Sequence, residues 1–275
     1  MLFRNKVIIV TGGSGGIGRS VATFFAEEGA KVIVVARNAV EIKKTVREIG
    51  NRGGKIFGIK TDVSKKRDVK KTVSQVLKKF KTVDVLVNCA GVQKPIGPFA
   101  ETKLEEWKKN VEINLLGTVT FCHEVLPVMM KRKKGKIINF SGGGATSSRP
   151  NFSAYAVAKT GVVRFTEILA EEVRHYNIQV NAVAPGAVNT RMLAEVLKAG
   201  RRAGSKEFDE ATERQKKGGT PPELAAKLVL FLASPKSDGL TGRLISAVWD
   251  SWQKWNRKDI KEILNSEKFT LRRIK

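Results

Sequence analysis

The chain has 275 residues, 41% of them hydrophobic, and its 51 Lys and Arg against 26 Asp and Glu give a formal net charge of +25. This length fits one large α/β domain or two small ones, and no apolar run approaches the ~18–20 residues that cross a bilayer. The N-terminal apolar stretch is too short for a signal peptide. Cys89 and Cys122 lie in apolar contexts without a second pair, so we expect neither a disulfide framework nor a metal site, and a cytoplasmic location is the default.

The excess of positive charge allows two interpretations, a nucleic-acid-binding surface or a lysine-rich solvated surface. Basic residues occur along the whole sequence without a long basic tail, and runs such as Lys131–Lys134 and Lys65–Arg67 fall at expected helix ends. Aromatic residues mostly recur at apolar core spacings instead of forming a surface on which bases would stack. A solvated surface is favoured, with no nucleic acid or membrane as partner, and a basic nucleic-acid binder stays as the less favoured alternative.

Short apolar runs alternate with segments of helical spacing from the N-terminus onward. "KVIIV" (6–10) ends at glycines, as a buried parallel strand does, and a helix is expected over 17–28. The further elements expected in chain order are strand 31–35, helix 39–49, strand 55–60, helix 64–80, strand 83–88, helices within 103–131, strand 136–140, helix 152–175, strand 178–184, helix 221–234 and strand 243–248. This alternation predicts a single-domain α/β fold, a doubly wound parallel sheet of about seven strands over 1–248, with a C-terminal extension at 249–275.

The sequence "TGGSGGIG" (11–18) follows the first strand and opens the first helix. Glycine permits positive φ there and lets a pyrophosphate approach the backbone, while the helix N-terminus supplies N–H groups and a partial positive charge. The spacing Gly12-x-x-x-Gly16-x-Gly18 differs from the general G-x-G-x-x-G fingerprint, and a glycine-rich turn alone is a weak signal. The turn therefore predicts a phosphate site without identifying an enzyme.

Five motifs occur in series along the chain. They are Thr11-Gly12-x-x-x-Gly16-Ile17-Gly18, Asn88-Cys89-Ala90-Gly91, Asn114, Tyr155-x-x-x-Lys159 and Pro185-Gly186. In order and spacing they resemble the motif series of the short-chain dehydrogenase/reductase family over about residues 5–245. The resemblance implies a Rossmann fold, a nicotinamide cofactor, and hydride transfer between that cofactor and the carbon of a small-molecule carbonyl or alcohol.

The resemblance assigns the chemical step to three side chains. Tyr155 would protonate the carbonyl oxygen as hydride arrives, but a phenol has a reference pKa near 10, poorly matched to neutral pH. Lys159, one helical turn on, would stabilise the phenolate, lower that pKa and reach the nicotinamide ribose. Asn114 resembles the helix asparagine that holds a water linked to the lysine.

Cofactor contacts carry over position by position. They are Thr11, Gly12, Ser14, Gly16, Ile17 and Gly18 in the phosphate turn, Asp62 and Val63 near adenine, Asn88, Ala90 and Gly91 on the adenosine side, Tyr155 and Lys159, and Pro185, Gly186, Val188 and Thr190 near the carboxamide. An acidic residue at the end of the second strand would select NAD. Ala36 and Arg37 stand there instead, and a guanidinium suits a 2′-phosphate. We therefore expect NADP to be preferred, with NAD possible and a solvated Arg37 as the alternative.

One family position departs from the pattern. Gly142 stands thirteen residues before the tyrosine, where the family has a serine that donates a hydrogen bond to the substrate oxygen, and Ser141 is one residue early. A shift of one residue along a strand turns a side chain to the other face, yet the following glycines can adopt conformations that bring the hydroxyl round. Ser141 is the favoured replacement, and a backbone N–H of the glycine run or a water is the alternative.

The remaining expectations are coarser. Substrate specificity is expected in the polar, mobile-looking segment 187–220, whose Arg191, Arg201 and Arg202 either recognise an anion or are merely solvated. The tryptophans of the extension are expected to pack against the domain or a neighbouring subunit. The family commonly forms homodimers and homotetramers by pairing its long helices, here within 103–131 and 152–175. A non-catalytic nucleotide-binding protein of the same fold is the alternative function.

Overall fold

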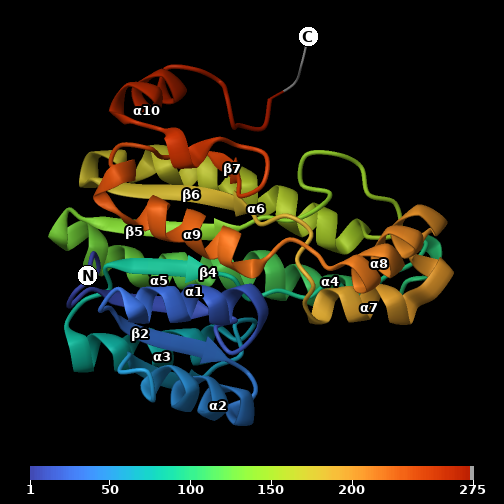
Figure 1. The fold of residues 1–275 in the computed structure, drawn as a ribbon, viewed down its shortest axis with the longest axis horizontal. Coiled ribbons are helices and arrows are strands. Elements are labelled where there is room, and N and C mark those ends of the chain that lie inside the picture. Colours follow the sequence, from blue (N-terminus) through green and yellow to red (C-terminus); the bar gives the residue numbers. More distant parts are fainter. Residues whose placement is uncertain (273–275) are drawn as a thin grey trace.

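Seven parallel strands form the central sheet of the computed structural model, which describes residues 1–272 (Figure 1). The strands are β1 Val7–Thr11, β2 Lys31–Ala36, β3 Lys55–Lys60, β4 Val85–Asn88, β5 Gly135–Phe140, β6 Ile178–Ala184 and β7 Leu244–Ser246. Their order across the sheet is β3-β2-β1-β4-β5-β6-β7, and all neighbouring strands run parallel. The structure thus confirms the predicted doubly wound sheet.

Helices cover both faces of this sheet. They are α1 Gly16–Glu27, α2 Ala39–Gly50, α3 Lys66–Phe80, α4 Leu104–Val111, α5 Gly117–Arg132, α6 Ser153–Glu172, α7 Arg191–Ala199, α8 Ser205–Lys217, α9 Pro222–Ala233 and α10 Arg257–Leu264. Side chains of β1 alternate between the faces: Ile8 and Val10 join Phe25 of α1 in the core under α1, α2 and α9. Ile9 joins Phe121 of α5 in the core under α3, α5 and α6.

The direction of the chain through the sheet reverses at β1. This strand has β2 on one side and β4 on the other, and ligands of open α/β sheets bind at such a reversal, beyond the carboxyl ends of the strands. Those ends point to the right in Figure 1, toward α4, α7 and α8. The glycine turn after β1 and the segment after β4 therefore meet where a ligand is expected.

The helical stretch Leu104–Arg132 contains one π-helical turn, Glu112–Leu116, between α4 and α5. Single π-turns inside α-helices are frequent at functional sites. Among the described residues, this is the one stretch with the length and composition of a membrane span. Its most apolar window of 18 residues has a mean hydropathy of 1.3, yet 44% of that window is buried in the fold. Phe121 and Met129 are fully buried, so the stretch acts as a core helix here.

Two helices, α7 and α8, fill most of the segment that the sequence analysis describes as mobile-looking. Leu193, Val196 and Ala211 are buried and form a small core with Phe152, which precedes α6. Charged residues stand between these apolar positions in the sequence, which hides the pattern. The small core fixes α7 and α8 beside the start of α6.

The C-terminal extension folds back onto α9. Trp252 and Trp255 pack around Phe231, with ring centroids 5.8 and 6.4 Å away, as expected for packing against the domain. Trp249 differs, because it is 85% exposed. Residues 273–275 of the predicted extension lie outside the described part of the chain.

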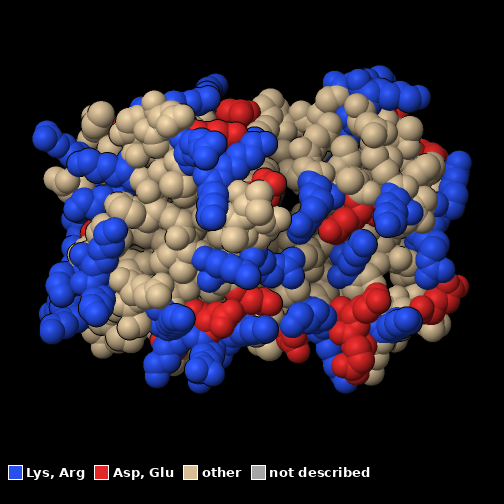
Figure 2. All heavy atoms as spheres, turned by 90° about the horizontal axis from the view of Figure 1, so that it is seen from below, with Lys and Arg blue, Asp and Glu red and all other residues tan. Residues whose placement is uncertain are grey.

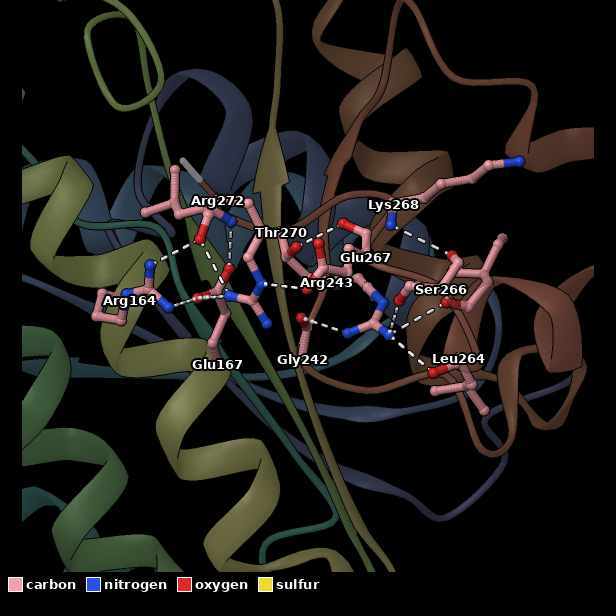
Figure 3. A network of polar contacts seen from close by, with 12 residues as sticks. Arg164, Glu167, Gly242, Arg243, Leu264, Ser266, Glu267, Lys268, Thr270 and Arg272 are labelled. Atoms are coloured by element: carbon pink, nitrogen blue, oxygen red, sulfur yellow. Dashed lines mark hydrogen bonds and ion pairs between the residues drawn. The ribbon is translucent and has the colours of Figure 1, made fainter. Parts of the chain in front are cut away.

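A buried arginine ties the end of α10 to the sheet (Figure 3). Nη2 of Arg243, which follows the turn before β7, donates at 3.1 Å to three carbonyls at and after the end of α10, those of Ile263, Leu264 and Ser266. The carbonyls of Ile263 and Leu264 are among the last four of α10, which lack intrahelical partners, and Ser266 follows the end of the helix. Next along the chain, the Leu244 N–H donates to the Phe269 carbonyl at 2.8 Å, so the extension also covers the outer edge of β7.

The positive charge is spread over the surface. Figure 2, seen from below Figure 1, shows Lys and Arg across the whole visible face with groups of Asp and Glu between them. Many of these charges form exposed ion pairs, such as Arg202 with Glu101 at 2.7 Å and Lys109 with Glu112 at 2.9 Å. On this face, basic and acidic side chains are interspersed and do not form one uninterrupted basic patch.

Candidate active site

The glycine turn between β1 and α1 leaves the helix N-terminus open. Gly12 and Gly16 have φ of +66° and +49°, and a Cβ at Gly12 would come within 2.9 Å of the Ala90 Cα, so the close approach requires glycine. The N-cap residue Gly15 offers no capping side chain, the first turn of α1 has no acidic residue, and a Cβ built at Gly15 meets nothing within 4 Å. The first N–H groups of α1 are therefore available to an anion such as a pyrophosphate.

The other predicted members of the turn support its shape. Gly18 packs on the turn so closely that a Cβ there would overlap the Gly12 carbonyl. The Ser14 carbonyl accepts a hydrogen bond from Thr45 Oγ1 of α2 at 3.3 Å, and Ile17 packs against the core under α1. The structure thus brings all the predicted residues of the phosphate turn together.

Thr11 connects this turn to the segment after β4. Its Oγ1 accepts hydrogen bonds from the backbone N–H groups of Cys89 and Ala90, both at 3.1 Å. Asn88 donates through Nδ2 to Asn139 Oδ1 of β5 at 2.9 Å, and its own buried Oδ1 has no partner among the described residues. The ends of β1, β4 and β5 are fixed relative to one another by these bonds.

Arg37 and Asp62 lie at the ends of β2 and β3. Burial would raise the pKa of Asp62, but hydrogen bonds from Ser64 and the positive charge of Arg37 lower it below its ordinary value. Val63 beside it is buried, and Arg37 is exposed. Ala36 has no charge, so Arg37 is the charged residue that β2 presents at this end of the sheet.

The segment after β6 approaches the glycine turn. Pro185 and Gly186 follow the strand, Gly186 has a φ of +83°, and its carbonyl accepts from the Val188 N–H at 3.1 Å. Thr190 caps α7, and its Cγ2 would lie 3.0 Å from a Cβ built at Gly16. The predicted carboxamide segment and the phosphate turn therefore meet at the carboxyl edge of the sheet, where a ligand is expected, and this region is called the crevice below.

Tyr155 and Lys159 lie near the start of α6, and both side chains are buried, with 5% and 3% of each residue exposed. Their spacing puts them on one side of the helix. Lys159 Nζ donates to the Phe140 carbonyl at 2.8 Å and lies 5.8 Å from the centroid of the Tyr155 ring. The phenol and the amine are thus placed side by side at the carboxyl end of β5.

Burial dominates the ionisation of both groups. It raises the pKa of Tyr155 to about 12, an effect that the Arg149 guanidinium opposes, and it lowers the pKa of Lys159 to about 8. The sequence analysis expects Lys159 to lower the pKa of Tyr155. The structure adds Arg149 as a further cation that favours the phenolate, while Lys159 Nζ is held at the carboxyl end of β5 by its bond to the Phe140 carbonyl.

Asn114 lies in the π-helical turn and is fully buried. Its Nδ2 donates to the Val92 carbonyl at 2.8 Å and to Asn110 Oδ1 at 2.7 Å, while its Oδ1 accepts from the Val92 N–H at 3.2 Å. A Cβ built at Gly91 would lie 2.8 Å from Asn114 Oδ1 and 3.7 Å from Lys159 Nζ. Gly91 therefore separates the asparagine from the lysine, and both belong to one site.

The position of the family serine lies directly against the phenol. A Cβ built at Gly142 would overlap the Tyr155 hydroxyl. Ser141 is buried, and its hydroxyl has no hydrogen-bond partner among the described residues. Strand alternation places Ser141 on the same face of β5 as Asn139, which bonds Thr166 of α6 at 2.9 Å. Ser141 therefore lies on the face of the sheet that α6 covers.

The structure adds a charged residue that the sequence analysis does not select. Arg149, in the loop between β5 and α6, forms a bidentate ion pair with Glu207 of α8, with N–O distances of 2.6 and 2.8 Å. The partners are 58 residues apart, and no motif spacing links them. A lone arginine in a loop gives no local signal in the sequence.

Three arginines of segment 187–220, those named in the sequence analysis, each pair with a carboxylate. The pairs are Arg191 with Glu195 at 3.7 Å, Arg201 with Asp209 at 3.5 Å and Arg202 with Glu101 at 2.7 Å. A hollow of about 310 Å³ between residues 94–106 and α7 is lined by Lys and Arg together with Glu, and Tyr155 does not line it. Because the charges there are mixed, the hollow does not favour an anionic substrate over a neutral one.

Comparisons with known proteins cover most of the chain. The sequence profile of the short chain dehydrogenase family matches residues 6–200. The 3-oxoacyl-acyl-carrier-protein reductase FabG of Thermotoga maritima is 33% identical over 247 residues, covering 89% of this chain and 97% of the relative. The short-chain reductase protein NovJ of Streptomyces niveus is 37% identical over 246 residues, covering 88% and 92%. The crystal structure of a variant of actinorhodin polyketide ketoreductase with NADPH aligns with a TM-score of 0.81 at 32% identity, covering 88% of this chain and 95% of that one.

The family profile spans the glycine turn, Asn114, Tyr155 and Lys159. The structure places these same residues around one crevice at the carboxyl edge of a doubly wound sheet. With relatives above 30% identity over nearly their whole length, the chain belongs to the short-chain dehydrogenase family of oxidoreductases.

Proposed function

We propose that the protein is an NADP-dependent oxidoreductase that reduces a carbonyl group, or oxidises the corresponding alcohol, with Tyr155 as general acid or base. The observation that carries this proposal is the burial of the Tyr155 phenol beside the Lys159 amine at the carboxyl end of β5. Burying an ionisable group costs free energy, and strongly perturbed ionisable groups cluster at catalytic sites.

The residues of the crevice fit a dinucleotide with a 2′-phosphate. The uncapped N-terminus of α1 suits the pyrophosphate, and Arg37 beside the uncharged Ala36 suits the additional phosphate. The ketoreductase neighbour carries NADPH in its crystal structure. We further propose that Asp62 and the segments 88–91 and 185–190 hold the adenosine and nicotinamide ends. When bound, NADPH supplies the hydride.

The protein's own side chains would handle the proton. Because burial raises the pKa of Tyr155 to about 12, the phenol is protonated at neutral pH and can donate its proton to a carbonyl oxygen. Lys159 would bind the ribose hydroxyls and, when protonated, stabilise the phenolate that remains. Asn114 would hold residues 91–92 in place beside the lysine through its bonds to Val92.

The substrate class that we propose is a small-molecule ketone or its secondary alcohol. Two of the relatives are named for the reduction of oxoacyl or polyketide carbonyls. The hollow beside α7 carries charges of both signs, so it suits a polar, uncharged chain next to the carbonyl. The proposal does not require a carrier protein to present the substrate.

Replacement of Tyr155 by phenylalanine tests the proposal. We expect a carbonyl library, followed by NADPH absorbance, to reveal a substrate for the unmodified protein. Tyr155→Phe should then lose ~10²–10⁴ of kcat, as expected for removal of a general acid, with the Kd for NADPH unchanged because the ring is kept. Wild-type rates in the variant would contradict the proposal, and NADPH binding without any turnover in the unmodified protein would instead identify a non-catalytic nucleotide-binding protein.

A further inference from the structure

The loop between β5 and α6 carries a half-buried ion pair that the catalytic scheme above does not use. Arg149 donates through Nε and Nη2 to the two carboxylate oxygens of Glu207, at 2.6 and 2.8 Å. The side chains are only 14% and 25% exposed, and the guanidinium carbon lies 3.8 Å from the centroid of the Phe152 ring. A bidentate pair that is stacked on a buried aromatic ring has a fixed geometry, unlike a solvated surface pair.

The third nitrogen of this guanidinium faces the glycine run at the start of the loop between β5 and α6. Arg149 Nη1 lies 3.4 Å from a Cβ built at Gly143. In the amide orientation that satisfies both of its neighbours, the Gln93 side chain bridges this nitrogen to α7: its oxygen accepts from Nη1 at 3.1 Å and its nitrogen donates to the Met192 carbonyl at 3.0 Å. The arginine is therefore held simultaneously by α8, by the segment after β4 and by its own loop.

Consecutive glycines place this charge near the catalytic phenol. The backbone of Gly142 lies against the Tyr155 hydroxyl, and the backbone of Gly143 lies against the guanidinium. A Cβ at Gly142 would overlap the phenol, whereas a Cβ at Gly143 would only touch the guanidinium. The Gly142 that removes the family serine thus also allows the phenol and the guanidinium to approach the same short stretch of backbone.

The other ionisable groups around Tyr155 and Glu207 act on them in different ways from Arg149. Cys89 faces Tyr155 from the segment after β4, and its negative form would disfavour the phenolate. Lys159 bonds the Phe140 carbonyl. Lys206 and Arg214 of α8 act with Arg149 in lowering the pKa of Glu207, which burial would raise, and Glu195 of α7 accepts from the Gln93 N–H at 3.2 Å. Arg149 therefore acts beside Lys159 as a second cation that favours the phenolate, and unlike Lys159 it is held by a carboxylate.

We propose that Arg149 is a positioning residue for the proposed reaction, one that Glu207 holds in place and partly neutralises so that its charge sets how readily Tyr155 gives up its proton. This proposal rests on the proposed function. Arg149 acts through Tyr155, and Glu207 acts through Arg149. Any movement of α8 that loosens the pair changes the charge experienced by the phenol, so the ion pair links the position of α8 to the acid strength of the catalytic group.

The signs of the expected effects separate this role from a merely structural one. Arg149→Gln removes the cation and should raise the pKa of Tyr155 by about one unit. Glu207→Gln keeps the cation but removes its counter-charge, and should lower that pKa. If the pair only held the loop together, both variants would admit water around the phenol. Because burial raises the pKa of Tyr155, both variants would then lower that pKa.

The chain contains only two tyrosines, Tyr155 and Tyr176, so the phenol can be titrated directly. In protein labelled with ¹³C at the tyrosine Cζ, two signals are expected, and their assignment follows from Tyr155→Phe. At a common alkaline pH below the onset of unfolding, we expect the Tyr155 signal to show most ionisation in Glu207→Gln, less in the unmodified protein and least in Arg149→Gln. This readout needs no substrate, so it is independent of the proposed function.

A kinetic experiment follows once an alcohol substrate is known. Oxidation requires the phenolate, so its kcat/KM rises with pH, and the midpoint of that rise should move up in Arg149→Gln and down in Glu207→Gln. Arg149→Lys keeps the charge without the bidentate geometry and should restore a midpoint close to that of the unmodified protein. The control is Asp209→Asn, which removes the exposed pair between Asp209 of α8 and Arg201 and should leave the midpoint unchanged.

Thermal unfolding shows whether each variant folds. If Arg149→Gln does not fold, Arg149→Lys can still be compared with the unmodified protein and with Glu207→Gln. Shifts of the same sign in Arg149→Gln and Glu207→Gln, or no shift in either, would overturn the proposal. So would a midpoint in Arg149→Lys that follows that of Arg149→Gln. A failure of the proposed function would appear separately, as undiminished turnover in Tyr155→Phe.

Discussion

The hydroxyl of Ser141 is buried at the end of β5, where the loop to α6 begins, without a hydrogen-bond partner among the described residues. A buried hydroxyl without a partner costs free energy, so Ser141→Ala should leave thermal stability unchanged or slightly higher. If this hydroxyl donates to the substrate oxygen, the same variant should lose ~10²–10³ of kcat. Steady-state rates beside melting curves check both expectations, with Ser147→Ala as the control.

An unchanged kcat in Ser141→Ala would instead assign the donor role to a backbone N–H of the glycine run or to a water. The structure makes this distinction sharp, because the variant does not unpair another group. Loss of activity in Ser147→Ala alone would contradict the Ser141 assignment as well.

Arg37 supplies the charge that should decide between the two nicotinamide cofactors. It is exposed at the end of β2, so we expect Arg37→Ala to weaken NADPH binding by ~10-fold, the loss of about one charge-assisted hydrogen bond. NADH lacks the 2′-phosphate and should bind with unchanged affinity. Fluorescence titration of both cofactors measures the two Kd values. Equal affinities for NADPH and NADH in the unmodified protein would refute the predicted preference.

At the residue scale, sequence motifs predict those site residues that lie within one backbone turn or on one helix. The glycine turn and the pair Tyr155 and Lys159 are local patterns, and the structure brings them to one crevice. The pair Arg149 and Glu207 joins the loop between β5 and α6 to α8, across 58 residues. Such a pair depends on tertiary packing, which no spacing in the sequence records.

At the scale of elements, inner strands such as β1 and β4 were predictable because each is a short apolar run buried on both faces. The helices α7 and α8 were not, because their apolar residues are few and are scattered among charges. Only the meeting of Leu193 and Ala211 with Phe152 in the folded chain shows why these helices are stable. The placement of the extension could not be predicted either. Its anchor, Arg243, precedes β7 and lies 20 to 23 residues before the carbonyls of Ile263 and Ser266 that it bonds.

The attachment of α10 through Arg243 makes a quantitative prediction. Arg243→Leu removes a shared donor from three carbonyls, of which Ile263 still accepts from Ser266, so we expect the free energy of unfolding to fall by about 2–4 kcal/mol. Release of the extension should also expose it to proteases after β7. Urea unfolding and limited proteolysis measure these effects, and Lys258→Leu, at an exposed position of α10, is the control. Equal stability of the two variants would show that the Arg243 bonds do not hold the extension.

At the scale of the molecule, α6 presents an apolar surface that the single chain does not cover. Val157 and Ile168 are 53% and 51% exposed, and eleven residues, about three helical turns, bring them to one face. Leu116, at the junction with α5, is 50% exposed. We therefore expect a homodimer or homotetramer that buries this face, as the resemblance to the family implies.

Light scattering of the unmodified protein tests this assembly. Val157→Lys with Ile168→Lys should yield monomers at micromolar concentration, because buried lysines without partners oppose association. The control is Val40→Lys, at an exposed position on α2, which should leave the assembly intact. A monomeric unmodified protein would contradict the prediction.

The two ends of the sheet are protected by different means. The outer strand β3 exposes Lys55 and Lys60, which discourage another strand from adding there. The outer edge of β7 depends on the later segment that contains Phe269. During synthesis β7 leaves the ribosome before its cover does, so for that interval an unpaired edge is open to strand addition by a neighbouring nascent chain. Aggregation on the ribosome should therefore be more sensitive to changes in the extension than to changes at β3.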